Sequence, residues 1–366
     1  MGALLIGGTG PTGPPIVRGL LERGHEVAIL HTGRHETSEI PDEVEHIHAD
    51  PWDEAALRVV LEGRDFDLLI AGYGRLRAIA EIAKGRCSHF ISLGGGPAYL
   101  GYMNSAALSP VGMSVPIRED APRVERETDD EKGYRIARTE DAVFSHHPRA
   151  AHFRYPIVYG PRQPLPREWS IVRRILDGRR RIILPDGGLT LSHFGYADNL
   201  AHAVLLAVDQ PEACAGRIYN CGDEDVLSLR QVVELIAEAL DHPLEIVSIP
   251  YALAPPTRPL VMQPWTTHRV YDLGRLRADL GYRDRVPARE AIQRTARWLV
   301  ENPPEKGGPE EIVLQDPFDY AAEDRLLSAW QSAVESMPEI EFKSEPGYTL
   351  SYSGPGGRVP SSPGFE

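Results

Sequence analysis

Cysteine and long apolar runs are scarce in this chain of 366 residues. Its three cysteines, Cys87, Cys214 and Cys221, form no C-x-x-C pair, and so sparse and odd a set is typical of reduced thiols in a cytosolic protein. No apolar run is long enough to span a bilayer. The first residues enter an apolar strand with no basic leader before it, so we expect no signal peptide and a cytoplasmic location.

Positive charge is also in deficit. Lysine and arginine together number 39 against 53 aspartates and glutamates, which gives a formal net charge of -14. An acidic chain repels phosphate backbones and anionic membrane surfaces, so we expect neither nucleic acid nor a membrane as a partner. Hydrophobic residues make up 42% of the chain, which is enough for a sizeable core and suits an enzyme with a small-molecule substrate.

Short apolar runs alternate with amphipathic stretches over the first two hundred residues. The runs predict strands over residues 3–6, 27–30, 44–48, 67–70, 89–92 and 151–155. Later stretches predict helices near residues 167–178, 196–208, 227–240, 289–301 and 317–336, with a strand near 243–250. Strands interleaved with helices predict an α/β fold, a Rossmann-type doubly wound parallel sheet with a smaller C-terminal substrate-binding lobe.

The domain organisation follows from this pattern. Residues 1–165 are expected to form an NAD(P)-binding Rossmann domain, to which residues 195–221 return. Residues 166–194 and 222–300 are expected to form the substrate lobe. Residues 301–366 are a C-terminal extension in which we expect one helix and a mobile tail, because glycine, proline and serine dominate from Ser344 onward.

A glycine loop carries the strongest functional signal. The segment Gly7-Gly8-Thr9-Gly10-Pro11-Thr12-Gly13 follows the first strand directly and opens a helix. Gly7 suits the sharp turn, Gly10 lets the backbone approach a pyrophosphate, and Gly13 lets the helix pack closely. The free N–H groups at the helix start attract that anion. The loop therefore predicts a nicotinamide dinucleotide as cofactor.

The end of the second strand indicates which dinucleotide binds. An NAD site usually has an acidic residue there to hold the ribose hydroxyls. Here the chain reads His31-Thr32-Gly33-Arg34-His35, with no carboxylate at the tip. Arg34 can meet a 2′-phosphate, which favours NADP. NAD stays open as the alternative, because Glu36 could turn toward the ribose.

Further segments resemble the extended short-chain dehydrogenase/reductase family, in its NAD-dependent epimerase/dehydratase group, over about residues 1–300. The matching segments are Asp50, Ala71-Gly72-Tyr73, Arg154-Tyr155-Pro156-Ile157-Val158-Tyr159-Gly160-Pro161-Arg162, Gly195-Tyr196-Ala197-Asp198-Asn199 and Tyr219-Asn220-Cys221-Gly222. The resemblance implies cofactor contacts by Asp50, Ala71, Gly72 and Tyr155, and substrate contacts by Arg162 and His193. It also implies a homodimer, since members of this family often pair.

The same resemblance implies a catalytic Tyr-x-x-x-Lys pair and a Ser or Thr after the fifth strand. A phenolate moves the substrate proton, and the nearby cation lowers its pKa. The best match is Tyr134 with Arg138 in place of lysine, which keeps a permanent charge at the same helical spacing. Gly94 stands where the hydroxyl belongs, and Ser92 lies two residues earlier. The predicted catalytic set is therefore Tyr134, Arg138 and Ser92, and it departs from the family pattern.

Two other groups of side chains could bind ligands. Arg75, like Arg77, follows the fourth strand at its carboxyl end, where α/β sheets bind ligands, so Arg75 is a candidate for an anionic substrate group. His46 and His48 share a strand face, but we interpret them as non-metal histidines. His193 has no second ligand at helical spacing. No metal is therefore expected.

Two functions compete. The first is an NAD(P)-dependent oxidoreductase or epimerase/dehydratase-type enzyme on a small polar substrate, with sugar nucleotides among the candidates and Tyr134 moving the proton. Tyr73, Tyr99 or Tyr155 are the alternative acid/base groups. The second is a non-catalytic dinucleotide-binding sensor or regulatory module, which the incomplete catalytic set favours. The acidic charge argues against an RNA-associated role.

Overall fold

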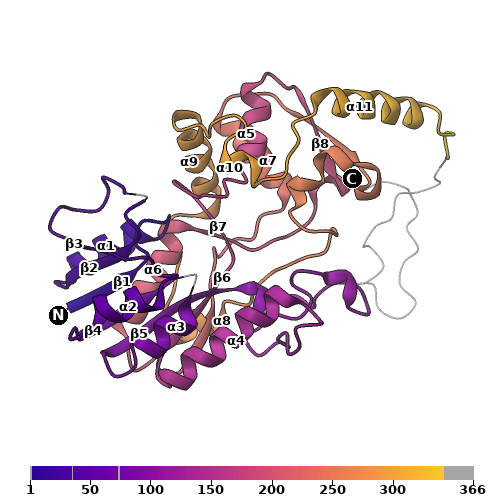
Figure 1. The fold of residues 1–366 in the computed structure, drawn as a ribbon. Helices are drawn as coiled ribbons and strands as arrows, with labels where there is room; N and C mark the ends of the chain where they lie inside the picture. The colour runs from indigo at the N-terminus through magenta and orange to yellow at the C-terminus, as the bar shows by residue number, and fades with distance from the viewer. Residues whose placement is uncertain (1, 35, 73–74, 342–366) are drawn as a thin grey trace, which may run out of the picture. The chain divides into compact units, whose positions relative to one another are not determined.

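A computed structural model describes residues 2–34, 36–72 and 75–341, and at its centre lies a parallel sheet of seven strands (Figure 1). The strands are β1 (Gly2–Ile6), β2 (Glu26–His31), β3 (Glu45–His48), β4 (Phe66–Ala71), β5 (Cys87–Gly95), β6 (Ala151–Tyr155) and β10 (Arg217–Asn220). They lie in the order β10, β6, β5, β4, β1, β2, β3, and each neighbouring pair is parallel.

This strand order confirms the predicted Rossmann-type fold. All six apolar runs of the sequence analysis form strands of this one sheet. The order reverses between β1 and β4, so the chain leaves these two strands in opposite directions across the sheet. In doubly wound sheets the crevice at such a switch point is where ligands bind.

Helices cover both faces of the sheet. Alternate strand residues point to opposite faces, which divides the sheet's side chains between two apolar clusters. On one face lie α1 (Gly13–Glu22), α6 (Ala197–Asp209) and α8 (Gly274–Leu280). On the other lie α2 (Glu54–Leu61), α3 (Leu76–Ile82) and α4 (Glu131–His146). The ligand-binding edge is therefore framed by the start of α1 on one face and by α3 and α4 on the other.

A second lobe has its own apolar core. Its elements include α5 (Trp169–Leu176), α7 (Leu229–Ala239), α9 (Ala288–Glu301), and the parallel strands β8 (Arg181–Pro185) and β11 (Glu245–Ile249). Two short strands, β7 (Ile157–Tyr159) and β9 (Phe194–Tyr196), pair in parallel. The chain enters this lobe after β7 and returns from it at β9. The helices and the strand expected here are present, and Figure 1 shows α5, α7 and α9 grouped apart from the helices of the large sheet.

The C-terminal part holds one helix more than expected. Besides α11 (Tyr320–Glu335), which matches the helix predicted there, α10 (Pro309–Ile312) forms just after the Pro- and Gly-rich segment. The chain divides into Met1–Glu323 and Asp324–Glu366, and α11 crosses that boundary. The tail beyond residue 341 lies outside the described residues. Among the helices of the described part, none has the length and apolar character needed to cross a membrane.

Candidate functional site

The glycine loop joins β1 to α1, and its glycines serve different purposes. Gly7 and Gly8 have φ angles of +110° and +90°, which residues with a Cβ rarely adopt. A Cβ on Gly13 would lie 1.9 Å from the carbonyl oxygen of Gly8, so the helix can begin here only with glycine. A Cβ on Gly10 would meet nothing within 4 Å. The backbone of Gly10 is therefore open to a ligand.

The start of α1 determines which N–H groups a phosphate could use. The first turn contains two prolines, which have no N–H to offer. The N–H of Gly13 donates to the carbonyl of Gly10 at 2.9 Å. The backbone N–H groups of Thr9, Gly10 and Thr12 are the remaining candidate donors for an anion, and the side chain of Thr12 makes no capping hydrogen bond.

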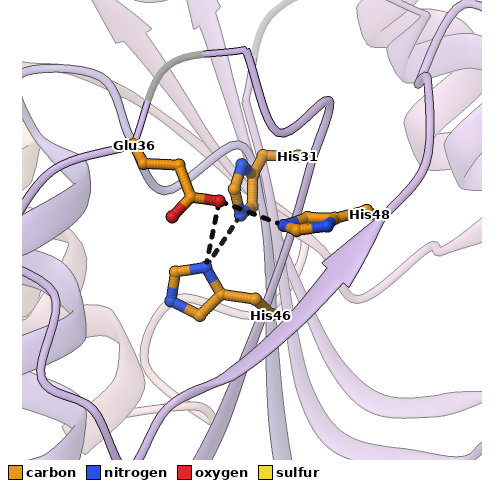
Figure 2. Close-up of side chains that lie close together, drawn as sticks. All are labelled: His31, Glu36, His46 and His48. Carbon is orange, nitrogen blue, oxygen red and sulfur yellow. Dashed lines mark hydrogen bonds and ion pairs between the residues drawn. The ribbon is translucent and has the colours of Figure 1, made fainter.

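The end of β2 carries Arg34 and a group of histidines. Arg34 is exposed, and its backbone N–H donates to Thr32 Oγ1 at 3.3 Å. The Oε1 atom of Glu36 lies 3.2 Å from His48 Nε2 and 3.9 Å from His46 Nδ1 (Figure 2). The carboxylate that could have served an NAD ribose is thus engaged by the histidines of β3.

Most other predicted cofactor residues lie at strand ends. Asp50 follows β3, and its Oδ1 accepts the backbone N–H two residues further on at 2.9 Å. Ala71 ends β4, and Gly72 follows it, hydrogen-bonded to the end of β1. Tyr155 ends β6 and is buried in the cluster that faces α1. Tyr73 lies outside the described residues.

The carboxyl end of β5 opens into a cavity of about 760 Å³ between α3 and α4. Gly94 and Gly95 line it from the strand, and Ile136 and Thr139 line it from α4. His152, on β6, also borders it. Its end at Gly94 and Gly95 lies at the carboxyl edge of the sheet, which makes that end a candidate space for the reacting part of a dinucleotide, while Glu81 and His146 line the cavity further along α3 and α4.

Ser92 lies below this cavity and is fully buried. Its Oγ is 2.7 Å from Nδ1 of His152. A Cβ built on Gly94 would lie 2.4 Å from Nε2 of the same imidazole. His152 therefore fills the space beside Gly94. The hydroxyl of Ser92, which was predicted to be catalytic, forms a hydrogen bond with that ring instead.

The predicted pair on α4 faces a different cavity. Tyr134 and Arg138 line a space of about 450 Å³ that is bordered by the acidic segment 119–125. Ile136 and Thr139, on the other side of the same helix, line the β5 cavity. The i to i+4 spacing does bring tyrosine and arginine to one cavity, which Arg154 of β6 and Ile218 of β10 also line, on the other side of α4 from Ile136 and Thr139.

A buried ion pair next to this site was not predicted. Arg154 donates from Nε and Nη2 to the Glu140 carboxylate at 2.7 and 2.8 Å, and from Nη1 to the Glu119 carbonyl at 3.0 Å. Burial opposes ionisation of Glu140, but hydrogen bonds from Arg154 and His152 outweigh it and hold the pKa of that carboxyl below its usual range. The pair joins α4 to β6.

The predicted substrate residue Arg75 stands at the start of α3 and borders the β5 cavity together with Arg77. Its guanidinium lies 5.7 Å from the centre of the Trp52 ring, and Nη2 is 3.6 Å from the Glu54 carboxylate. These contacts hold Arg75 over the edge of the cavity while leaving it part exposed.

Arg162 follows β7 by three residues and is partly buried. It forms an ion pair with Glu39, from the segment between β2 and β3, and has a positive φ of 59°. Burial, with the nearby charge of Arg18, lowers the pKa of its guanidinium. The structure thus brings Arg162 to the loop that follows β2.

His193 is buried with both ring nitrogens engaged. Nδ1 accepts the backbone N–H of Tyr271 at 3.0 Å, so the proton lies on Nε2, which donates to the carbonyl of Asp223 at 2.8 Å. Burial lowers the pKa of the imidazole to about 4, which keeps the ring neutral. A substrate contact by His193 would require one of these bonds to open.

Two arginines that the sequence analysis did not assign lie near each other in the second lobe. Arg269 is buried, with its guanidinium 4.6 Å from the centre of the Tyr102 ring. Nε of Arg269 and Nε of Arg167 are both buried without a hydrogen-bond partner. Within the part of the chain that the structure describes, neither guanidinium has an ion pair. Burial, with a smaller effect from the charge of Arg269, lowers the pKa of Arg167. Such a pair suits an anion.

Comparison with known proteins places this geometry in context. The model of the NAD dependent epimerase/dehydratase family matches residues 135–222. The uncharacterized protein YbjS of Escherichia coli is 30% identical over 139 residues, which cover 32% of this chain and 41% of that protein. The chain thus spans less than half the length of this relative.

Two further similarities extend over most of the chain. A 3-diazoavenalumate denitrifying reductase of a Streptomyces species is 26% identical over 79% of this chain and 97% of its own length. The crystal structure of UDP-glucose 4-epimerase with UDP-glucose from Thermotoga maritima is 17% identical, with a TM-score of 0.65 over 82% of this chain and 99% of that chain. These findings confirm the predicted resemblance to the extended short-chain dehydrogenase/reductase family, in its NAD-dependent epimerase/dehydratase group.

Proposed function

We propose that this chain, with the fold and family match of an NAD-dependent epimerase/dehydratase, is an NADP-dependent enzyme that transfers hydride to or from a small substrate bearing a phosphate-type anion, with sugar nucleotides as the substrate class. The observation that carries the proposal is a pair of neighbouring arginines, the buried Arg269 and the partly buried Arg167, neither of which has an ion pair within the described residues. The glycine loop would hold the cofactor, and the arginine pair would hold the anionic part of the substrate.

The residues at the glycine loop fit a dinucleotide. Gly10 leaves open space where a pyrophosphate would approach, and the backbone N–H groups of Thr9 and Thr12 are the donors we expect it to use. Arg34 offers its charge to a 2′-phosphate, while the Glu36 carboxylate is held by His48. When bound, the cofactor supplies or accepts a hydride at its nicotinamide ring.

The arginine pair supports an anionic substrate because an unpaired buried charge is costly. Two guanidiniums without carboxylate partners repel each other, and a bound phosphate would remove that repulsion and form charge-assisted hydrogen bonds with both. The Glu168 carboxyl nearby does not compensate fully, since burial raises its pKa to about 7. A diphosphate linked to a sugar matches this arrangement better than a neutral carbonyl compound does.

The proton that accompanies hydride transfer needs a group beside Gly94. Tyr134 lines the other cavity, whereas the His152 ring borders this one directly below the strand end. Ser92 engages Nδ1 of His152, and Glu140 Oε1 lies 3.4 Å from Nε2. His152 is therefore our candidate for the proton-transfer group; its ring is buried and must become accessible to the substrate, and His152→Gln is expected to lower kcat by about 100-fold while NADPH affinity stays the same.

The first experiment is a titration of the purified chain with NADPH and with NADH, followed by nicotinamide fluorescence and thermal unfolding. Tighter binding of NADPH is expected. UDP-glucose or dTDP-glucose is then added to the NADPH complex, with the double variant Arg167→Met, Arg269→Met for comparison. The variant should lose nucleotide-sugar binding by at least about tenfold and keep NADPH binding. Arg230→Met, at an exposed ion pair of α7, is the matched control.

A second function remains a candidate because Gly94 offers no hydroxyl and Ser92 is buried. A chain that binds NADPH tightly but gives no turnover with any nucleotide sugar would be a dinucleotide-binding regulatory module. Binding of neither NADPH nor NADH would end both proposals.

A further inference from the structure

Three histidines and a glutamate gather at the carboxyl ends of β2 and β3. His31 is the last residue of β2, and His46 and His48 lie on β3, where His31 pairs with His48 in the strand register. Glu36 reaches them from the segment that follows β2. Figure 2 shows the carboxylate and the three rings turned toward a common centre. One ligand atom from each of the four residues lies within 4.8 Å of the other three.

Two of the separations between ligand atoms are close to the edge of a tetrahedral coordination shell. His31 Nε2 lies 3.1 Å from His46 Nδ1, Glu36 Oε1 lies 3.2 Å from His48 Nε2, and Glu36 Oε1 lies 3.9 Å from His46 Nδ1. Four ligands at the usual zinc–nitrogen and zinc–oxygen distances form a tetrahedron with edges of about 3.3 Å. Two of the separations are within a few tenths of an ångström of this edge, and binding of the ion would draw the remaining ligand atoms, which lie within 4.8 Å of one another, closer together.

The rings also present their nitrogens rather than their faces. The planes of His31 and His46 meet at 76°, those of His31 and His48 at 88°, and those of His46 and His48 at 87°. Stacked imidazoles would have only their faces in contact. Edge-on rings that surround one point are the arrangement in which several imidazoles can share a single ion.

We propose that His31, Glu36, His46 and His48 bind one Zn²⁺ ion. Three imidazoles and one carboxylate are ligands that Zn²⁺ prefers, and four protein ligands close the tetrahedral shell, as in structural zinc sites. The sequence pattern alone shows His46 and His48 as a strand pair. The structure adds His31 from the neighbouring strand and Glu36 from the loop.

Coordination requires one proton and one hydrogen bond to move. His31 Nδ1 accepts the backbone N–H of Gly33 at 3.2 Å, so in the absence of metal the ring carries its proton on Nε2, facing His46 Nδ1. A zinc ion at Nε2 displaces that proton, and Nδ1 then carries one and cannot accept from Gly33. Zinc binding should therefore shift the backbone of Gly33 and the segment beside Arg34.

The ion would fix the segment that follows β2 to β3. Glu36 is on that segment, and a zinc bond holds it more firmly than the present contacts with two histidines. Zinc binding does not depend on the proposed cofactor, because all four ligand atoms come from this chain and the glycine loop contributes none. A result that disproves the zinc site would therefore leave the NADP proposal intact, and a result that disproves the NADP proposal would leave the zinc site intact.

The test uses the full chain after removal of metal with a chelator. Co²⁺ is added first, because four-coordinate cobalt gives a strong visible absorption, and Zn²⁺ affinity is then measured by competition with a coloured chelator. One equivalent of metal per chain is expected. His48→Gln is the main variant, since the side chain of His48 is 56% exposed and its loss should not disturb the fold. It should weaken Zn²⁺ binding by at least about 100-fold, and His46→Gln should do the same.

The matched control is His268→Gln, an exposed histidine of the second lobe. Unchanged Zn²⁺ affinity in the control, with the loss confined to the cluster variants, supports the site. Equal affinity in His48→Gln and the unaltered chain overturns it, and so does a metal-free chain that shows no cobalt absorption. Loss of affinity in all three variants would mean scattered surface binding and would also overturn it.

Discussion

The imidazole of His152 occupies the space that a side chain at position 94 would need. A Cβ on Gly94 would lie 2.4 Å from His152 Nε2 and 2.6 Å from Cε1, and Ser92 holds the other side of the ring. The family resemblance implies a hydroxyl-bearing residue at this strand end. In this chain a histidine from the neighbouring strand takes that space.

This contact predicts a strong coupling between the two positions. Gly94→Ser should destabilise the chain by about 1–3 kcal/mol, because the core must make room for the new atoms. In a His152→Ala background the same serine should cost less than about 0.5 kcal/mol, since the obstructing ring is gone. Urea unfolding of the four proteins measures the coupling. Additive effects of the two substitutions would contradict the steric explanation.

Tyr134→Phe tests the catalytic pair that the sequence suggested. Because Tyr134 and Arg138 border the cavity on the far side of α4 from Gly94, we expect kcat and the NADPH dissociation constant to change by less than about threefold. The assay is turnover with the nucleotide sugar identified by binding. If the variant instead turned over about 100-fold more slowly, Tyr134 would be restored as the catalytic acid/base.

The Glu140–Arg154 ion pair predicts how stability depends on pH. The pKa of Glu140 is depressed in the folded chain, so its stabilising effect is complete above the ordinary value of 4.5 and is lost as pH falls below it toward the folded pKa. Glu140→Gln should cost about 3–5 kcal/mol at pH 7, because it leaves Arg154 buried without its partner.

The difference between Glu140→Gln and the unaltered chain should narrow between about pH 5 and pH 3. Thermal unfolding across that range provides the measurement, with the exposed pair variant Glu131→Gln as the control. A constant difference at all pH values would show that the carboxyl does not titrate with folding.

Arg34→Ala tests cofactor choice. If Arg34 contacts a 2′-phosphate, the substitution should weaken NADPH binding by about tenfold and leave NADH binding unchanged, since only NADPH carries that group. Fluorescence titration with both nucleotides is the measurement. Arg64→Ala, at an exposed ion pair with Glu45, is the control. An equal loss of affinity for NADPH and NADH would mean that the substitution disturbs the loop rather than a contact with the 2′-phosphate.

The parts predicted from the sequence depend on local pattern. A parallel sheet buried on both faces needs near-continuous apolar strands, and residues 3–6 and 67–70 supply such short apolar runs. The glycine loop is equally local, because the turn and the close approach of backbone to backbone are both encoded within Gly7 to Gly13.

The parts that could not be predicted depend on contacts between distant residues. Ser92 and His152 are 60 positions apart, and nothing near either one indicates that they meet. Tyr134 and Arg138 line one cavity together, but a helix pattern cannot say which side of α4 borders Gly94. The Arg167–Arg269 pair forms only when the second lobe brings them together, and it too has no local signal.

The open space around Gly10 makes that residue a reporter for the cofactor. At Gly13 a methyl group would collide with the Gly8 carbonyl even in the free protein, so any loss of binding there mixes damage to the fold with loss of contact. At Gly10 the free protein has room for alanine, and only an arriving pyrophosphate would meet the added carbon. If a Gly10→Ala chain unfolds at the normal temperature but no longer binds NADPH, the added methyl group must clash with the cofactor. That result would show that the bound phosphates lie against Gly10.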